Sequence, residues 1–186
     1  GSYGMSALSK FFNTKEPEHA PQDLSTRTDW LRKVYLFENL TGIPAAIDLL
    51  AQLVEEKGFS KYSSILREGE EGKEAFFLLS GSVKVIKSTT AGEHFPVAIL
   101  TADDHPSFGE AALLQTDRRN ATIVCETDCQ VLVLHKEAFD AFCGEHPEWA
   151  LPVVLRIARV IVERLHKANN DVILLYNALM NEVKGL

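Results

Sequence analysis

The chain has 186 residues, of which 46% are hydrophobic and 24% charged, and its formal net charge is −7 at pH 7. This length and composition predict one domain with a core of ordinary size. The negative charge argues against a general nucleic-acid surface, and no apolar run approaches the roughly 20 residues that a membrane span needs. The sequence has no nucleophile elbow, phosphate loop or metal-ligand motif, so we expect neither an enzyme nor a metal site.

The N-terminal part, residues 1–27, is polar and contains Pro17 and Pro21, which predicts a flexible arm. Residues 1–4 are interpreted as an expression remnant before a native start at Met5. Helical spacing of apolar residues then predicts one helix beginning at Thr28-Asp29 and a second from Pro44 to about Lys57.

The middle of the chain is typical of an antiparallel sheet. Between Phe59 and Leu134, short apolar runs are separated by Gly, Asp and Asn turns. The predicted strands are Ala75–Leu79, Ser82–Ile86, Phe95–Leu100, Thr122–Cys125 and Gln130–Leu134. This pattern predicts a rolled sheet or jelly roll, with positive φ angles at the glycines of a tight turn, Gly69 and Gly72.

The C-terminal part predicts one long helix over residues 152–183. A heptad seam runs along it, made of Val154, Ala158, Ile161, Leu165, Ala168, Val172, Leu175 and Leu179. Through Leu165 the seam fits packing on its own domain as well as dimerisation. From Ala168 to Leu179 it extends beyond the expected domain, which favours a partner helix and a homodimer. The three cysteines, Cys125, Cys129 and Cys143, form no CxxC pair and are interpreted as reduced core residues.

The segment from Phe108 to Thr122 carries the functional signal. Gly109 permits close backbone approach to a ligand, and residues 109–114 can form a short helix whose free amides suit an anion. Arg119 offers a fork of donors that suits a phosphate, and Glu110 can accept a sugar hydroxyl. Together they indicate a ribose 3′,5′-cyclic phosphate. The alternative is that Arg119 only forms an ion pair with a nearby acid, such as Glu110 or Asp117, without any ligand.

These residues resemble the phosphate-binding cassette of the cyclic nucleotide-binding domain family, and the register matches without a gap from Phe108 to Thr122. Residues 69–85 resemble the family's paired-glycine strand–turn–strand element. The segment Leu36–Leu40 and the His146-Pro147-Glu148 junction of the closing helices also match. The resemblance covers about residues 30–168 and implies a domain over 28–168. The implied fold is mixed α+β, an antiparallel β-roll flanked by N-terminal helices and a long C-terminal helix.

The resemblance also implies which residues contact the ligand. The expected contacts are Phe108, Gly109, Glu110, Ala111, Ala112, Arg119, Asn120, Ala121 and, from the long helix toward the base, Asn169 and Asn170. Members selective for cyclic GMP tend to carry Thr after the phosphate-binding Arg. Asn120 stands there, so cyclic AMP is expected, with cyclic GMP as the alternative. Arg118 departs from the family's usual Pro, which leaves the preceding loop less rigid.

The sequence thus predicts a cytoplasmic, dimeric, bacterial-type cyclic nucleotide receptor that relays a conformational signal to an unidentified protein. No winged helix follows the long helix, so no attached DNA-binding domain is expected. Two alternatives stay open. One is a ligand-free scaffold that keeps the fold, and the other is the regulatory fragment of a larger protein.

Overall fold

The computed structural model describes residues 7–8, 11 and 24–185. Most of the predicted arm over residues 1–27 therefore lies outside the described residues. Leu8 is an exception, because it is buried in the core and its N–H donates to Glu145 Oε1 at 3.1 Å. Residues 24–27 are helical. The arm prediction is corrected at these positions, where packing holds the chain.

Three helical segments open the described chain, namely α1 (Leu24–Lys33), η2 (Tyr35–Leu40) and α2 (Pro44–Leu53). The strands are β1 (Glu55–Phe59), β2 (Ser64–Leu66), β3 (Glu71–Gly72), β4 (Glu74–Ser80), β5 (Ser82–Ser88), β6 (His94–Thr101), β7 (Ser107–Phe108), β8 (Asp117–Arg118), β9 (Thr122–Cys125) and β10 (Cys129–His135). Two short 3-10 helices, η3 (Ala102–Asp104) and η4 (Glu110–Leu113), flank β7, and α3 (Lys136–Glu145) and α4 (Pro147–Lys184) close the chain.

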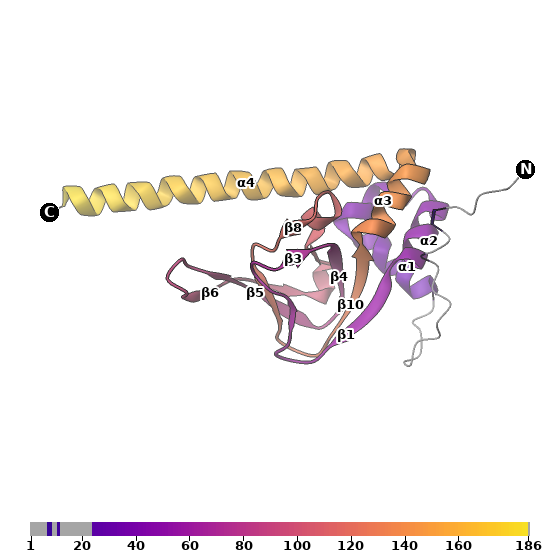
Figure 1. Ribbon diagram of the computed structural model, residues 1–186, viewed down its shortest axis with the longest axis horizontal. Coiled ribbons are helices and arrows are strands. Elements are labelled where there is room, and N and C mark those ends of the chain that lie inside the picture. Colours follow the sequence, from indigo (N-terminus) through magenta and orange to yellow (C-terminus); the bar gives the residue numbers. More distant parts are fainter. Residues whose placement is uncertain (1–6, 9–10, 12–23, 186) are drawn as a thin grey trace, which may run out of the picture.

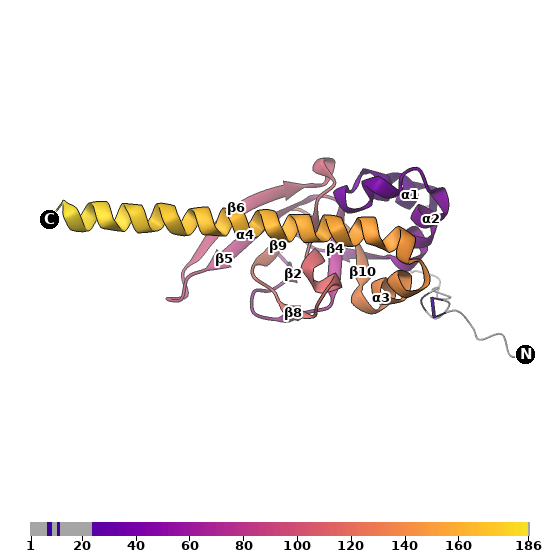
Figure 2. The ribbon, with the colours of Figure 1, turned by 90° about the horizontal axis from the view of Figure 1, so that it is seen from above.

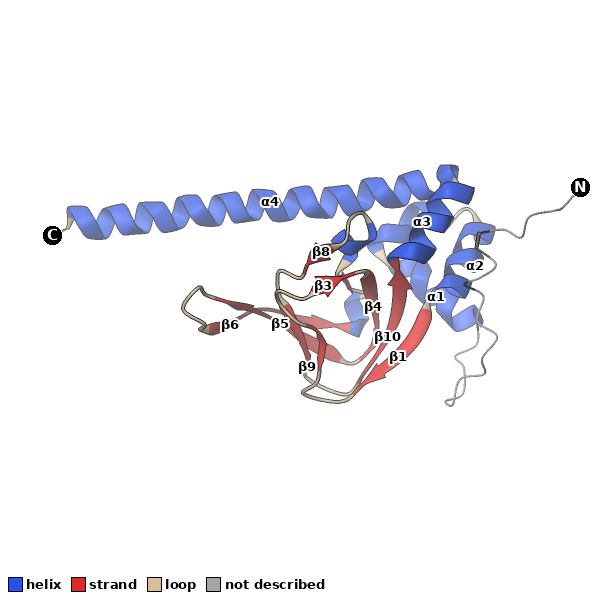
Figure 3. Cartoon of the chain, viewed as in Figure 1, coloured by secondary structure: helices blue, strands red, loops and turns tan. Residues whose placement is uncertain are grey.

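The strands form the predicted antiparallel roll. One sheet has the order β1-β10-β4-β7, a second has the order β2-β9-β5-β6, and β3 pairs with β8. The shorter helices gather at one end of the roll, while the β5–β6 hairpin and the C-terminal half of α4 extend from it in the opposite direction (Figures 1 and 3). The predicted fold class is confirmed.

Three predicted helix boundaries are wrong, and one of them is the start of the long C-terminal helix, which begins at Pro147 and not at residue 152. The Thr28 hydroxyl donates to the Ser25 carbonyl at 2.8 Å inside α1, so Thr28 is not the residue that caps the helix, which begins at Leu24. The second helix ends at Leu53 and not near Lys57, because residues 55–59 pair with β10. Pairing with β10 gives the backbone N–H and C=O groups of this polar segment their hydrogen-bond partners.

The core consists of two clusters of buried side chains. The larger joins α1, η2, α2, α3 and the start of α4 to one sheet, with Phe37, Phe77 and Phe142 fully buried. The smaller fills the roll and contains Cys125 and Cys129. Burial raises the pKa of Cys125 to about 11, which keeps its thiol protonated at neutral pH. Both residues fill the core, as predicted, and Cys143 is half-buried.

Only the first third of α4 belongs to the core. Its buried residues are Ala150, Val153 and Ile157, and all residues from Ile161 to Leu179 are exposed. Arg156 fastens this part to η2 by donating to the Tyr35 carbonyl at 2.7 Å and the Glu38 carboxylate at 2.6 Å. Viewed from above, α4 crosses over the roll and continues past it (Figure 2).

The heptad seam is therefore offset from the face that the domain buries. Val154 and Ala158 are half-buried, whereas Leu165, Val172, Leu175 and Leu179 are at least half exposed. The residues of α4 that are buried against the domain are Ala150, Val153 and Ile157, which form a neighbouring row on the helix. Most of the seam is therefore exposed in the described chain.

These contacts predict different stability effects at two isoleucines of one helix. Ile157→Ala removes fully buried methyl groups and should lower the free energy of unfolding by about 2–4 kcal/mol. Ile173→Ala, at a side chain that is 57% exposed, should change it by less than about 0.5 kcal/mol. Urea denaturation followed by circular dichroism measures both. Equal losses would show that the distal half of α4 is packed in solution.

Candidate functional site

The cassette begins where β7 ends. Phe108 is buried and stacks on Phe76 with ring centroids 5.5 Å apart, which anchors the strand. Gly109 then takes a left-handed conformation with φ +72°, a conformation that favours glycine. The short helix predicted over residues 109–114 forms as η4, and its Ala112 and Leu113 face the interior. The backbone around Glu110 is thus held from both sides.

Arg119 follows β8, and its backbone is fixed by two bonds to the turn before β3. Arg119 N–H donates to the Glu70 carbonyl, and Gly69 N–H donates to the Arg119 carbonyl, both at 2.8 Å. Gly69 has φ +85°, as predicted, but Gly72 does not have a positive φ. That part of the turn prediction is wrong, and Gly72 is required for a different reason.

Gly72 and Gly109 make room for the guanidinium of Arg119. A Cβ on Gly72 would lie 2.1 Å from Arg119 Cζ, and a Cβ on Gly109 would lie 2.7 Å from Arg119 Nη1. Neither separation is possible between real atoms. Any side chain at either glycine would therefore move the guanidinium, so these two residues determine where Arg119 can lie.

The partner of Arg119 is Glu74. Arg119 Nη2 donates to the Glu74 carbonyl at 2.9 Å and to Glu74 Oε2 at 3.2 Å, and Nη1 makes a longer bond of 3.4 Å to the Gly109 carbonyl. The predicted alternative, an ion pair with a nearby acid, is formed, but its partner is Glu74 and not Glu110 or Asp117. Burial lowers the pKa of Arg119, while the carboxylates of Glu74 and Glu110 act in the opposite direction, and a guanidinium stays charged.

Glu110 is a buried carboxyl group with one free oxygen. The residue is 1% exposed, and its Oε1 accepts a hydrogen bond from Arg164 Nη2 on α4. Its Oε2 is also buried and has no hydrogen-bond partner in the described part of the chain. Burial raises the pKa of Glu110 even though Arg164 lowers it. A buried acceptor without a donor is unfavourable, so the position suits a hydroxyl that arrives with a ligand.

The remaining predicted site residues divide into two groups. Ala111, Ala112 and Ala121 lie on the buried or half-buried side of the cassette and Asn120 is exposed beside Arg119. Asn169 and Asn170 are exposed on α4, and at 100° per residue they lie about 140° and 120° around the helix from Arg164. Within this chain α4 does not turn them toward Glu110.

Sequence reasoning missed Gly72, Glu74 and Arg164 as site residues. Gly72 belongs to the paired-glycine element that the sequence analysis describes, so this motif could have identified it as a residue that makes room for Arg119. Glu74 and Arg164 reach the cassette across 45 and 54 residues of chain respectively, and spacing carries no signal at that range.

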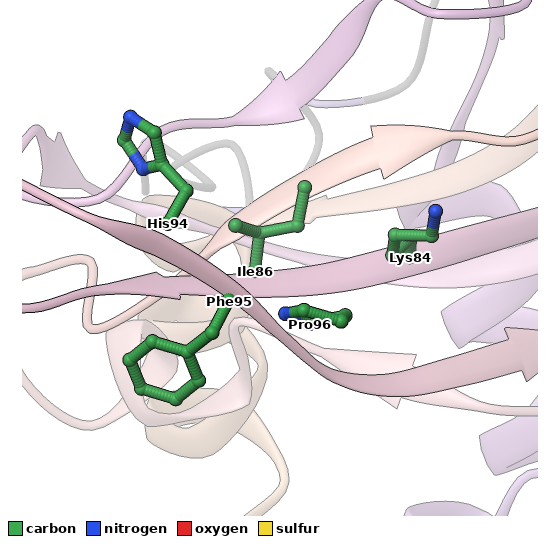
Figure 4. A pocket seen from close by; sticks show the side chains of 5 residues that line it. All are labelled: Lys84, Ile86, His94, Phe95 and Pro96. Atoms are coloured by element: carbon green, nitrogen blue, oxygen red, sulfur yellow. The ribbon is translucent and has the colours of Figure 1, made fainter.

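A shallow pocket of about 190 Å³ lies on the β5–β6 hairpin, lined by Lys84, Ile86, His94, Phe95 and Pro96 (Figure 4). None of its lining residues belongs to the cassette. Its polar groups already have partners, since Lys84 Nζ lies 3.1 Å from Glu126 Oε1 and His94 Nδ1 lies 2.9 Å from the Ser88 hydroxyl. Neither Lys84 Nζ nor His94 Nδ1 is therefore free to recognise a nucleotide.

Within residues 24–185 and the three described positions before them, no three His, Cys, Asp or Glu side chains are grouped so that they could hold a metal ion. Among the described helices, none combines the length and apolarity needed to cross a membrane.

The comparisons with known proteins agree with this geometry. Residues 56–146 match the model of the cyclic nucleotide-binding domain family. This part of the chain belongs to that family. Human cGMP-dependent protein kinase 2 is 36% identical over 121 residues, which are 64% of this chain and 16% of the kinase. The chain thus spans less than two thirds of this relative's length.

Two further relatives are bacterial regulators. A CRP-like cAMP-activated global transcriptional regulator of Mycobacterium tuberculosis is 23% identical over 142 residues, covering 76% of this chain and 59% of the regulator. The crystal structure of the Thermus thermophilus catabolite activator protein matches with a TM-score of 0.63 and 25% identity, over 73% of this chain and 62% of that one. The cyclic nucleotide-binding domain is a regulatory sensor domain in such proteins.

The raised pKa of Glu110 predicts how the stability of this domain depends on pH. A carboxyl group whose pKa is raised on folding adds stability below its ordinary pKa of 4.5, and this contribution is lost as the pH rises through the folded-state value. Glu110→Gln lacks that loss. The free energy of unfolding of Glu110→Gln minus that of the wild type should therefore increase as the pH rises from about 4.5 toward neutrality.

Urea denaturation at several pH values measures this difference. Glu71→Gln is the matched control, because that carboxylate is 66% exposed and its replacement should leave the pH profile nearly unchanged. A shift in favour of the wild type with increasing pH would mean that the Arg164 pair outweighs the effect of burial.

Proposed function

We propose that the chain is a cyclic nucleotide receptor without catalytic activity of its own. The observation that carries the proposal is the free Oε2 of Glu110, a buried acceptor in the same cassette as the guanidinium of Arg119, whose side chain is only 8% exposed. A ribose 2′-hydroxyl would donate to Glu110, and the cyclic phosphate would accept from Arg119. The absence of side chains at Gly72 and Gly109 would let the phosphate approach the guanidinium closely.

The remaining cassette residues would contribute shape and backbone. Ala111, Ala112 and Ala121 are small, which keeps the backbone accessible, and Phe108 anchors the loop. The N–H of Asn120 would face the phosphate. No metal ion is required in this arrangement, because two arginines supply the positive charge.

We infer that the ligand is cyclic AMP, with cyclic GMP as the competing candidate. The support is Asn120, which stands where a Thr would favour cyclic GMP. The relatives named above include both a cGMP-dependent kinase and a cAMP-activated regulator. Asn169 and Asn170 point away from the cassette of their own chain, so base contacts from them would have to come from a second copy.

Arg164 provides a route by which the ligand would act on α4. Its side chain is 49% exposed, and the pair with Glu110 connects the long helix directly to the cassette. A hydroxyl that binds the Glu110 carboxylate changes the charge distribution and position of the group that Arg164 contacts. Ligand binding would thereby shift the equilibrium between two positions of α4.

The exposed seam on α4 supports self-association of this cytoplasmic receptor. Leu165, Val172, Leu175 and Leu179 form an apolar row of heptad spacing that the domain does not cover. A second copy in parallel would bury it. Other apolar residues of the helix lie off the seam, among them Ile173, Leu174 and Tyr176, and they would remain available for the downstream protein.

The ligand-free scaffold remains the second candidate, and one specific observation favours it. Both charged groups of the site already have partners within the chain, Glu74 for Arg119 and Arg164 for Glu110. The regulatory-fragment alternative agrees with the partial coverage of the relatives.

Ligand-dependent stability distinguishes the receptor from the scaffold. Cyclic AMP at 100 times its dissociation constant should add about 2.7 kcal/mol to the free energy of unfolding. Arg119→Ala should abolish this gain because it removes the charge-assisted contact to phosphate, and Glu110→Ala should reduce it less. Thermal denaturation with cyclic AMP, cyclic GMP and neither measures each case. No gain with either nucleotide would support the scaffold.

The seam predicts a difference between two aspartate substitutions on one helix. Leu175→Asp places a charge in the proposed dimer contact and should shift the chain toward monomer, whereas Asn177→Asp, off the seam, should leave the dimer intact. Size-exclusion chromatography with light scattering measures the mass of each. A monomeric wild type with and without nucleotide would refute coupling through dimerisation.

A further inference from the structure

The carboxylate of Glu74 lies where it can control access to Arg119. Its Oε2 accepts from Arg119 Nη2 at 3.2 Å and from the Lys73 N–H at 3.2 Å. The Glu74 carbonyl accepts a second bond from the same nitrogen at 2.9 Å. Arg119 Nη2 thus donates to both the carbonyl and the carboxylate of Glu74, the first residue of β4.

A histidine lies on the other side of this carboxylate. His135 lies directly opposite Glu74 in the β4–β10 register, and its Nδ1 is 4.0 Å from Glu74 Oε1. The other ring nitrogen, Nε2, lies 3.2 Å from Glu55 Oε2 on β1. Glu74 is one third exposed, so its side chain has room to move between Arg119 and His135.

We propose that Glu74 sets the affinity of the nucleotide site by competing with the ligand phosphate for Arg119. This inference rests on the proposed function and identifies a residue that the cassette motif does not contain. A phosphate that approaches the guanidinium meets a carboxylate already bound to Nη2. The two anions would then lie on the same guanidinium and repel each other. Ligand binding requires the carboxylate to leave.

The fold indicates where the displaced carboxylate goes. The backbone of Glu74 is held by the pairing of β4 with β10, so only the side chain changes position. Rotation toward His135 shortens the existing 4.0 Å separation, while the Glu74 carbonyl keeps its bond to Arg119. The guanidinium thus stays oriented by the backbone as its charge becomes available to phosphate.

Glu74→Gln tests the sign of the effect. The amide keeps the size of the side chain and loses the negative charge, so the variant should bind cyclic AMP roughly tenfold more tightly in calorimetric titration. Glu71→Gln is the matched control, since it removes the same charge from a side chain that is 66% exposed and pairs with Lys73. Its affinity should stay within about twofold of the wild type.

A second readout separates competition from a structural role. The NMR resonances of the His135 ring should shift when cyclic AMP binds to the wild type, and this shift should be lost in Glu74→Gln. Equal binding by Glu74→Gln, with the wild type binding normally, would show that the carboxylate does not compete, and weaker binding would show that it positions Arg119. Either result would overturn the inference while the receptor function stands.

Two remaining outcomes address the proposed function itself. Binding by Glu74→Gln alone would support the inference in its strongest form, with the wild-type carboxylate blocking the site. Absence of binding by both proteins, to cyclic AMP and cyclic GMP alike, would overturn the receptor function together with the inference, because removal of the competitor reveals no site.

Discussion

The arrangement of the site depends on a steric constraint: one guanidinium occupies space that two glycines leave open. Arg119 passes so close to Gly72 and Gly109 that no Cβ fits at either position. The two glycines come from different segments, the β3 edge and the start of the cassette, and Arg119 joins them. The roll, the β3–β8 pair and the η4 turn can therefore be understood as the support for a single side chain.

Charge balance follows from that placement. Two arginines and two glutamates alternate around the cassette, with Arg119 on Glu74 and Arg164 on Glu110. Each pair joins elements distant in sequence, and each has one member that is more exposed than the other. Removing one partner from such a pair leaves a charge in a partly desolvated position, which is costly, whereas exchanging partners is much less so. In a site of this kind, a ligand binds more favourably by replacing one of the paired side chains than by adding to pairs that stay intact.

Much of this could be predicted from local sequence. The cassette from Phe108 to Thr122 is contiguous, so the short helix after Gly109 was predicted correctly, and the ligand contacts of Glu110 and Arg119 stay predictions. β1 was missed because its residues, Glu55–Phe59, are mostly polar and show little alternation of polar and apolar side chains, and only pairing with β10 makes them a strand.

Glu74 and Arg164 were missed because contacts across about 50 residues depend on topology. The long helix α4 was predicted correctly, but the offset of its heptad row from the buried row of Ala150, Val153 and Ile157 depends on how the helix is rotated on the roll.

The β5–β6 hairpin shows how the molecule limits the ways in which it can associate. β6 is the edge of its sheet, and it exposes Phe95, Val97 and Ile99, a composition that would ordinarily invite another strand to add. Pro96 lacks the N–H that such a strand would need, and the register shift between Val85 and Ile86 interrupts the flat ladder beside it. The edge is thereby protected against open-ended β-stacking, and the exposed helix is left as the surface on which ordered contacts can form.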